Sequence, residues 1–444
     1  MIKITAKLGR MYVNGKGEWG QMTGFRGHRL LRNITLALGI SLGLSLTSIM
    51  STCGWFSSGV SYAQMALSPD QPEGVSPIQE TGIPENANMT LGRYERVNIP
   101  DGHAVIHVSD SKGLKNAFRQ VADNGGHGAI ILEDGQYRLE TTVYINHPNV
   151  MLLSKSNDPE KVIIRGSGMQ PGNRVKNLLQ INSSGFVLEG ITLQQAGNHL
   201  VQLAAEKNAD VPTFRNCIIE DGYEQLLKVS FDKKNHPRTL SDNGLVEYCV
   251  FRYTAGIGPN YYIGGIDAHG IRGWVIRHNV FQNIASPADR IAEHAVHIWN
   301  NTSNNTVENN VFIDNDRAIG FGMRMKNRHP NIIYSNFGGK IVNNLIYHTD
   351  RGNPFSDAGI ILEDSPYTLI KDNWIYLEHR YPRAIEYRFP ETRQVRVTGN
   401  QTNKRIASRN GGHGELARNT ESLERNAFML ELEDRLESLN LTGF

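Results

Sequence analysis

The sequence is poor in cysteine and has almost no excess of charge of either sign, and these shortages narrow the classes of protein it can belong to. Its three cysteines allow at most one intramolecular disulfide among 444 residues. The 46 Lys and Arg residues nearly balance the 44 Asp and Glu residues, and a net charge of +2 argues against a nucleic-acid-binding protein. No G-x-S-x-G element, P-loop, dinucleotide fingerprint or His/Cys zinc spacing stands out, so we predict no metal ligands. Glycine, by contrast, is abundant at 44 residues, which suits a chain that turns often rather than a long helical bundle.

The N-terminal region has the features of an export signal. Basic residues precede an apolar, uncharged stretch at positions 34–50, and Ser61 and Ala63 are small residues of the kind that a signal peptidase requires. We therefore expect a signal peptide over residues 1–63, with Met22 as an alternative start, and export to the periplasm or the outside of a bacterium. The alternative is an uncleaved membrane anchor, since the apolar stretch borders on spanning length. Residues 64–104 show no periodicity and are expected to form a linker.

A short sequence pattern recurs from residue 186 onward. In each copy, an apolar residue between polar residues is followed by Asn and then by two apolar residues. The Asn position falls at residues 216, 248, 279, 310, 344, 373 and 400, with Tyr248 taking the second place, and the intervals are 32, 31, 31, 34, 29 and 27 residues. A period of this size is typical of a solenoid, whose units must stack to bury their apolar faces. Asn suits the position because it tolerates a left-handed bend and its amide can bond to the Asn above and below.

The two ends of the repeat region carry predicted helices. The segment 111–124 places apolar residues on one helical face, and Ser111 can cap its start, so we expect a short helix that covers the first coil. The apolar residues of that face are Leu114, Ala117, Phe118 and Val121. In the C-terminal region, residues 404–444, a charged amphipathic helix is expected over 420–439 as either a cap or a mobile tail.

The passage after the first predicted helix points to a family. An apolar strand at 128–132 is followed by Asp134-Gly135-Gln136-Tyr137. This order of helix, apolar strand and Asp-Gly-x-Tyr resembles the opening of pectate-lyase-like proteins. The resemblance covers roughly residues 105–403 and implies an all-β chain folded as a right-handed parallel β-helix over that range.

Two of the cysteines occupy the same position in successive copies of the repeat. Cys217 follows Arg215-Asn216, and Cys249 follows Glu247-Tyr248. If these copies stack in adjacent coils, the Cα atoms of the two cysteines lie about one strand spacing apart, ~4.8 Å, which is within disulfide reach. A disulfide and a pair of free thiols that fill the core are both open at this point.

The strand before each Asn turn can be aligned on an inward apolar pair. These pairs are Ile266/Ala268, Val296/Ile298, Ile319/Phe321, Ile360/Leu362 and Ile385/Tyr387. Because side chains alternate along a strand, the residues between and beyond the pairs point outward. One outward column then holds Asp267, His297, Gly320, Ile361 and Glu386, with Lys228 above, and the next holds His269, Trp299, Gly322, Glu363 and Arg388, with Ser230 above.

The outward patch has the residue types needed to remove the C5 proton of a uronate. This weakly acidic proton requires a base of near-neutral pKa, such as His, and cations that stabilise the enolate. A second acid then protonates the leaving 4-oxygen in a lyase, or returns a proton from the other face in an epimerase. The expected catalytic residues are Lys228, Asp267, His269 and His297, and the expected substrate-binding residues are Trp299, Arg272, Arg317, Arg324, Glu293, His294 and Tyr262. Gly320 and Gly322 provide either a flat floor for a sugar ring or a site of tight packing.

A narrower resemblance concerns the strand Gly265-Ile266-Asp267-Ala268-His269, which is similar to the Gly-x-Asp-Pro-His signature of mannuronan (alginate) C5-epimerases. The following turns, 293–297 and 316–321, also resemble the next coils of those enzymes. The resemblance implies that Asp267 contacts the substrate carboxylate and that His269 acts as acid or base. The chain departs from the family in having Ala268 for Pro, Gly270 for an acidic residue, and Gly264 where the family has its catalytic Tyr.

Two other functions are weighed against this one. A polysaccharide-binding or adhesin-type β-helix without catalysis has the same fold, and fold alone does not exclude it. A glycoside hydrolase of the polygalacturonase type needs carboxylates at defined separations, and the Asn-Thr-Asp and Asp-Asp pairs of those enzymes are missing. The expected partner is an anionic polysaccharide, with no nucleic acid, and with a membrane only if the leader is uncleaved. No cofactor is expected to be required, although Ca²⁺ is an option because pectate-lyase relatives often use it.

Overall fold

The structure is a computed structural model that describes residues 94–440. The predicted signal peptide at 1–63, the alternative start Met22 and the first part of the predicted linker lie outside the described residues. Within residues 94–440, no helix combines the length and the apolar character that crossing a membrane requires.

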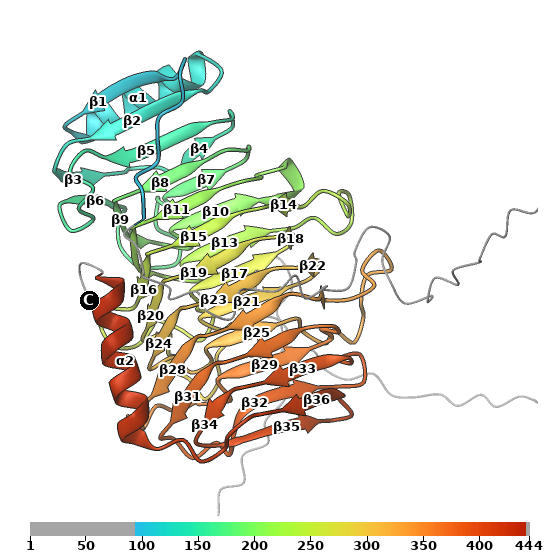
Figure 1. Cartoon of the computed structure of the whole chain (residues 1–444). Coiled ribbons are helices and arrows are strands. Elements are labelled where there is room, and N and C mark those ends of the chain that lie inside the picture. The colour runs from blue at the N-terminus through green and yellow to red at the C-terminus, as the bar shows by residue number, and fades with distance from the viewer. Residues whose placement is uncertain (1–93, 441–444) are drawn as a thin grey trace, which may run out of the picture. The chain divides into compact units, whose positions relative to one another are not determined.

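The described chain is a right-handed parallel β-helix, as the sequence predicts (Figure 1). Its strands pair in parallel with the strands of the coils above and below, so each sheet runs along the solenoid. Sheet A contains β1 (Ala104–Val108), β2 (Gly128–Leu132), β5 (Val150–Ser154), β8 (Val187–Glu189), β11 (Thr213–Arg215), β15 (Leu245–Glu247), β19 (Val275–Arg277), β23 (Thr306–Glu308), β27 (Lys340–Val342), β30 (Leu369–Lys371), β33 (Val395–Thr398) and β36 (Gly414–Ala417).

Sheet B contains β3 (Gly135–Arg138), β6 (Val162–Arg165), β9 (Thr192–Ala196), β12 (Ile218–Gly222), β16 (Val250–Arg252), β20 (Val280–Gln282), β24 (Val311–Ile313), β28 (Leu345–His348), β31 (Trp374–Leu377) and β34 (Gln401–Thr402). Sheet C contains β4 (Val143–Ile145), β7 (Leu179–Ile181), β10 (Val201–Ala204), β13 (Leu227–Ser230), β17 (Ile266–His269), β21 (Val296–Trp299), β25 (Ile319–Phe321), β29 (Ile360–Glu363), β32 (Arg383–Arg388) and β35 (Arg405–Arg409). The short sheet D contains β14 (Ser241–Asp242), β18 (Ile271–Arg272), β22 (Thr302–Ser303) and β26 (Asn336–Phe337), and a 3-10 turn, η1, covers Ala205–Lys207.

Stacked apolar side chains fill the interior of the solenoid. Phe251, Phe281 and Phe312 lie on successive coils, with ring centroids 4.9 Å apart and nearly parallel planes. This separation equals the spacing between neighbouring strands, so one ring lies over the next along the axis. A coil cannot bury such rings alone, which is why the chain folds as a stack.

The asparagine ladder is confirmed over the later coils and corrected in the first two. Each ladder side chain except the last donates from Nδ2 to Oδ1 of the Asn in the next coil, over 2.9–3.0 Å. The members are Asn279, Asn310, Asn344, Asn373, Asn400 and Asn419. In the two coils above them the equivalent positions are held by Cys217 and Cys249, so the assignment of Asn216 and Tyr248 to the ladder was wrong by one residue.

The error has a physical reason. The sequence pattern assigns the left-handed bend and the ladder hydrogen bond to one Asn, but in the structure two neighbouring residues share these roles. The residue before each ladder position adopts the left-handed conformation, with φ between 50° and 57° at Asn216, Tyr248, His278, Asn309, Asn343 and Asp372. The ladder residue itself supplies the amide. Asn216 and Tyr248 therefore make the bend, and the two cysteines stand where later coils place the amide.

Asn344 lies in the middle of this ladder and is fully buried. Its amide donates to Asn373 Oδ1 and to the Val307 carbonyl, both at 2.9 Å, and accepts from Asn310. Replacing Asn344 with Ala leaves buried groups unpaired at about 1–3 kcal/mol each, so we expect the free energy of unfolding to fall by about 2–5 kcal/mol. Denaturant unfolding measures the change, and Lys340→Ala on the same coil should shift it by less than ~0.5 kcal/mol. Equal effects of the two substitutions would contradict the ladder's role.

The thiols of Cys217 and Cys249 are free and buried. Their coils are adjacent, since Ile218 pairs with Val250. Burial raises the pKa of the Cys249 thiol well above its usual range, with neighbouring Cys217 as a further cause. Of the two alternatives, the structure therefore has the pair of core-filling thiols.

Helix α1 (Ser111–Asp123) covers the first coil, as predicted (Figure 1). Leu114, Ala117 and Val121 are buried against the end of the core. The N-cap is Asp110 rather than Ser111, because the Asp110 carboxylate accepts from the Gly113 N–H at 2.6 Å.

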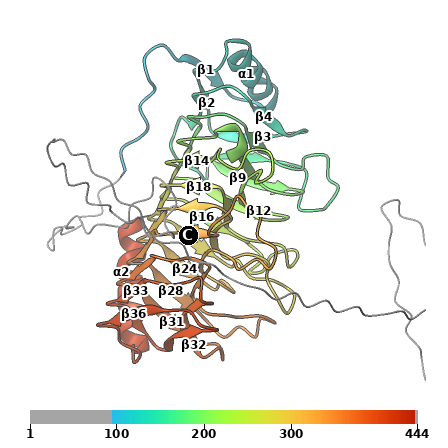
Figure 2. The ribbon, with the colours of Figure 1, turned by 90° about the vertical axis from the view of Figure 1, so that its right-hand side faces the viewer.

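Helix α2 (Arg425–Leu439) is neither an end cap nor a mobile tail. It lies alongside the lower coils, parallel to the stack (Figures 1 and 2). Phe428, Leu432 and Leu439 pack on outward apolar residues of sheet B. Those sheet B residues are Ile218, Val250, Val280, Val311, Leu345 and Tyr347.

The β-helix also extends beyond the predicted boundary at residue 403, because β35 and β36 follow it. The last coil is short, and its ladder residue, Asn419, comes only 19 residues after Asn400. The ladder intervals in the sequence pattern are 27–34 residues, so the pattern does not reveal this coil, whose interval is shorter.

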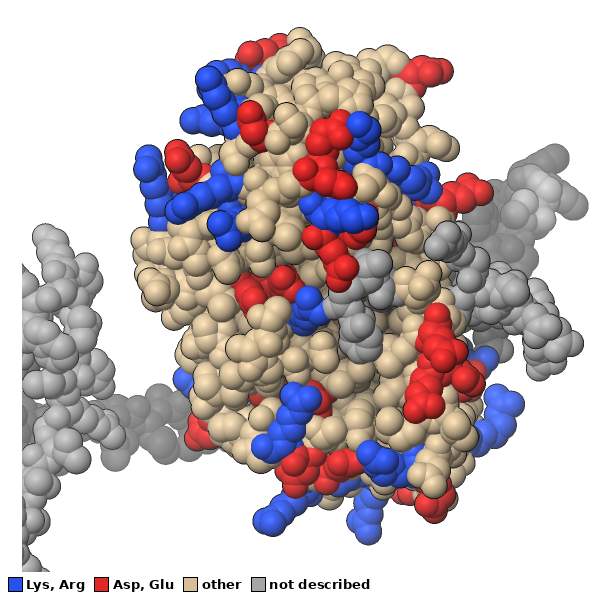
Figure 3. All heavy atoms as spheres, turned by 90° about the vertical axis from the view of Figure 1, so that its left-hand side faces the viewer, with Lys and Arg blue, Asp and Glu red and all other residues tan. Residues whose placement is uncertain are grey.

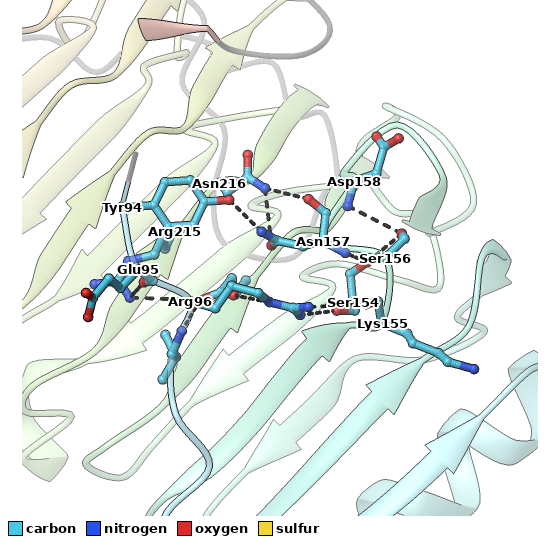
Figure 4. Close-up of polar contacts among 12 residues, drawn as sticks. Tyr94, Glu95, Arg96, Ser154, Lys155, Ser156, Asn157, Asp158, Arg215 and Asn216 are labelled. Atoms are coloured by element: carbon cyan, nitrogen blue, oxygen red, sulfur yellow. Dashed lines mark hydrogen bonds and ion pairs between the residues drawn. The ribbon is translucent and has the colours of Figure 1, made fainter. Parts of the chain in front are cut away.

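The end of the predicted linker is a packed strap, formed by residues 94–99 along the outside of sheet A (Figure 4). Tyr94 Oη accepts from Asn157 Nδ2 at 2.7 Å. Arg96 bonds to Glu189 at 3.2 Å and to the Ser154 carbonyl at 2.6 Å. These contacts fix the strap, so the linker cannot extend to residue 104 as expected.

Acidic and basic side chains are interspersed on the face shown in Figure 3, where no broad area of one sign is visible. On sheet A, for example, Arg215 and Arg277 flank Glu247, at 2.6 and 2.8 Å. This pairing agrees with the near-zero net charge.

Candidate active site

The predicted outward columns are present on sheet C. Lys228 pairs with Asp267, Asp267 with His297, and His297 with Gly320 in the strand register. His269 pairs in the same way with Trp299. The sequence therefore placed these residues on one strand face correctly.

Asp267 is the centre of the site. Its side chain is fully buried and accepts from Lys228 Nζ in a close ion pair and from Trp299 Nε1 at 2.8 Å, and His269 Nε2 lies 3.3 Å away. Burial alone would raise the pKa of this carboxyl, but the Lys228 ammonium and His269 hold it well below its usual range. Asp267 is therefore an anion that organises the groups around it.

Lys228 and His269 are the partners of Asp267 that retain some exposure. Their side chains are 11% and 14% exposed, and Lys228 Nζ lies 3.2 Å from His269 Nε2. Burial acts to lower the pKa of Lys228, but Asp267 outweighs it and the net shift is upward, so the ammonium stays charged. Burial lowers the pKa of His269 despite the neighbouring Asp267. The site thus holds a neutral imidazole beside a fixed cation.

His297 forms a buried pair with Glu293. Its Nδ1 makes a close contact with the Glu293 carboxylate, and its Nε2 lies 3.2 Å from the Gly322 carbonyl. Burial acts to lower the pKa of His297, but Glu293 outweighs it and the pKa is raised. The side chain is 2% exposed and its ring stacks on Trp299 at 5.4 Å. Both ring nitrogens of His297 thus face oxygen acceptors inside the protein, so its expected direct catalytic role stays a prediction that these contacts do not support.

His294 is buried beside this pair, with its ring centroid 4.5 Å from that of His297. Neither of its ring nitrogens has a hydrogen-bond partner among the described residues. Burial, followed by His297 and Arg317, lowers its pKa well below the usual range. A Cβ at position 320 would lie 2.6 Å from the His294 ring, so Gly320 makes room for this side chain.

The close contacts at glycines 320 and 322 therefore support the packing alternative of the two. Gly322 has φ of +73°, and a Cβ there would lie 1.9 Å from the Glu363 carbonyl oxygen. Both glycines are forced by close approach of protein atoms.

The same argument explains two of the departures from the epimerase pattern. A Cβ at Gly264 would lie 2.9 Å from Glu293 Cβ, so a Tyr has no room there. Gly270 has φ of +57°, and a Cβ there would lie 2.6 Å from the Phe231 ring. Tyr262, two residues before Gly264, is partly exposed, and burial raises its pKa while Lys228 and Asp267 are close enough to act on it. The loop before β17 thus places Tyr262 within electrostatic range of Lys228 and Asp267.

The three arginines expected to bind substrate already have carboxylate partners. Arg272 lies on sheet D and bonds to Asp242 at 3.1 Å, so the structure does not bring it to the cluster. Arg317 pairs with Asp357 at 3.0 Å, and Arg324 lies 3.7 Å from Glu391. The sequence shows charged residues but not which of them neutralise each other.

The structure adds three residues that sequence reasoning missed. Asn300 Nδ2 lies 3.5 Å from His269 Nδ1. Glu224 is close enough for Lys228 to affect its pKa, which burial raises. Gln225 is fully buried, and its amide has no partner among the described residues. Extending the strand alignment through the turn before β13 would have located Glu224 and Gln225.

Asp267, Glu293 and His297 offer ligand atoms within 4.8 Å of one another. The donors do not fit a calcium ion, because Ca²⁺ prefers several oxygen ligands, and Asp267 is already bonded to the Lys228 ammonium. Both nitrogens of His297 are also in use.

No family model and no curated protein matches the sequence. Among solved structures, the chain is similar to an alginate lyase from Paenibacillus sp. str. FPU-7, with a TM-score of 0.51 and 15% identity, over 70% of this chain and 99% of that chain. It is also similar to a glycoside hydrolase, with a TM-score of 0.51 and 10% identity, over 77% of this chain and 99% of that chain. At such identities the likeness establishes the fold.

Proposed function

We propose that this protein is an exported enzyme that removes the C5 proton of a uronate unit in an anionic polysaccharide. The observation that carries the proposal is the His269 imidazole on an outward strand face, with Nε2 3.2 Å from Lys228 Nζ and beside the buried Lys228–Asp267 ion pair. An alginate lyase has the same fold, which supports a polysaccharide as substrate.

His269 is the base in this proposal. As the C5–H bond breaks, its proton passes to the imidazole and its electron pair moves into the uronate carboxylate. The Lys228 ammonium stabilises the charge that develops there. Asp267 keeps that ammonium in place and, through Trp299 Nε1, fixes the indole that stacks on His297.

Tyr262 is the second acid. A phenol is protonated at neutral pH, so Tyr262 can donate a proton. Donation to the 4-oxygen breaks the C4–O bond and gives an unsaturated product, whereas donation to C5 from the opposite face gives the epimer.

Replacing Tyr262 with Phe is therefore expected to lower kcat by about 10²-fold with little change in the unfolding midpoint, since the side chain is partly exposed. Steady-state kinetics measures the effect, and Tyr261→Phe on the neighbouring exposed ring is the matched control. Equal kcat values for the Tyr262→Phe variant and the wild type would remove Tyr262 from the mechanism.

The competing functions are less well supported. Hydrolysis by a pair of carboxylates requires groups that meet substrate, but Asp267 is fully buried and bonded to Lys228 and Trp299. A binding module without chemistry does not require a neutral imidazole against a buried cation.

The purified protein can be tested on alginate, pectate, glucuronan and chondroitin. A gain in ultraviolet absorbance from a 4,5-unsaturated uronate indicates a lyase. A change in the anomeric NMR signals alone indicates an epimerase. Binding to a polymer with neither change would overturn the proposal in favour of a binding module.

A further inference from the structure

The outward column that carries Lys228 and Asp267 continues toward the N-terminal end of sheet C. In strand register, Lys228 pairs with Gln202, Gln202 with Gln180, and Gln180 with Tyr144. Tyr144 is 64% exposed, which is high for a large aromatic side chain. From Tyr144 to Asp267 the column crosses four strand spacings, or roughly 19 Å at ~4.8 Å each.

The side chains above Lys228 form a connected set that we name the amide track. Asn177 Nδ2 donates to Gln202 Oε1 at 2.8 Å and to Gln180 Oε1 at 3.2 Å. Gln180 Nε2 donates to Asn182 Oδ1 at 3.2 Å, and Asn182 Nδ2 to Asn146 Oδ1 at 2.7 Å. The amide track therefore consists of Asn146, Asn177, Gln180, Asn182 and Gln202.

The amide track differs from the asparagine ladder in its position and therefore in its role. Ladder residues such as Asn310 and Asn344 are fully buried and satisfy backbone groups at the bends. Gln180 and Gln202 lie on the outer face of the strands and are partly exposed, so their amides are accessible to a ligand. An amide has two N–H donors and an oxygen with two lone pairs, so Gln180 and Gln202 each keep at least one N–H and one lone pair beyond the bonds within the track, which matches the mixed donors and acceptors of sugar hydroxyls.

We propose that the amide track, with Tyr144 at its end, binds a hydroxyl-rich stretch of the polysaccharide that extends from the candidate active site toward the N-terminal end of the solenoid. This inference rests on the proposed function. The Tyr144 ring can cover the apolar face of one sugar ring, because an exposed aromatic side chain has an apolar body and a polar tip.

The charges around the track specify which part of the polymer it takes. Tyr144, Gln180 and Gln202 carry no charge, whereas Glu224 lies near Lys228, and Glu206 accepts from Ser230 at 3.1 Å. A uronate carboxylate pointing at these acids would be repelled. The track therefore binds the hydroxyl faces of the chain, and its contribution should change little with salt, unlike an ionic contact.

The test is to combine Tyr144→Ala with Gln202→Leu and to measure kinetics on oligosaccharides of increasing length. We expect kcat/KM to fall by about tenfold on the longest chains, which corresponds to ~1.4 kcal/mol, with a smaller loss on shorter chains. Gln194→Leu, on sheet B, and Leu430→Ala, on α2, are controls for the loss of a partly exposed amide and of an exposed apolar side chain. A loss of the same size at every length would overturn the inference.

A binding experiment separates this inference from the proposed function. If no uronate polymer is turned over, calorimetric titration of the longest oligosaccharide that binds still tests the track. Weaker binding by the double variant, to the same extent at low and high salt, supports it. Unchanged affinity would overturn it, whatever the outcome of the activity assays.

Discussion

Replacing His269 with Ala is expected to abolish turnover of the polysaccharide while leaving the β-sheet circular dichroism unchanged. General acid–base catalysis contributes about 10²–10⁴-fold, and His269 is the only imidazole of the predicted catalytic set with a partly exposed side chain in the described residues. The loss should appear in kcat, because the base acts after the substrate is bound.

The control for this substitution is His413→Ala, which removes an exposed histidine from the last coil. The pH profile adds a second check. Because the pKa of His269 is lowered, the base is already neutral at pH 7, and the acid limb of kcat/KM should lie below the ordinary histidine pKa. Wild-type turnover by the His269→Ala variant would contradict the assignment.

Replacing Lys228 with Met is expected to destabilise the protein as well as inactivate it. The substitution leaves the fully buried Asp267 carboxylate without its cation, and breaking a buried pair costs about 3–5 kcal/mol. Denaturant unfolding measures the stability, and the assay on the preferred polymer measures the activity.

The double variant Lys228→Met/Asp267→Leu distinguishes a functional pair from a structural one. Replacing both charges with apolar groups is often neutral for stability, so the double variant should regain most of what the single variant loses. It should still be inactive, because the cation that stabilises the enolate is absent. A stable and active double variant would show that the pair serves folding only.

The fold and the strand register could be predicted because both depend on local alternation of side chains. The inward pairs Ile266/Ala268 and Val296/Ile298 set the register of β17 and β21. A shift by one residue would move these apolar side chains from the core to the outer face of the strand. The turn residues were less certain, since Asn at 216 and Asn at 279 look equivalent in sequence but occupy neighbouring positions of the bend.

The contacts made by loops could not be predicted. The Glu293–His297 pair and the contact of His294 with Gly320 depend on the conformation of the residues just before β21. The partner of Arg317, Asp357, lies 40 residues away along the chain, outside the 27–34-residue period of the coils. Arg272 and Asp242, by contrast, are register partners in adjacent coils, and their 30-residue separation fits that period.

The most direct test of the central claim is release of a label from C5. Uronate polymers carrying deuterium at C5 would be incubated with the purified protein, and deuterium in the water would be measured. We expect release from at least one polymer with the wild type and none with the His269→Ala variant. Binding of a polymer without release of label from any of them would contradict the claim.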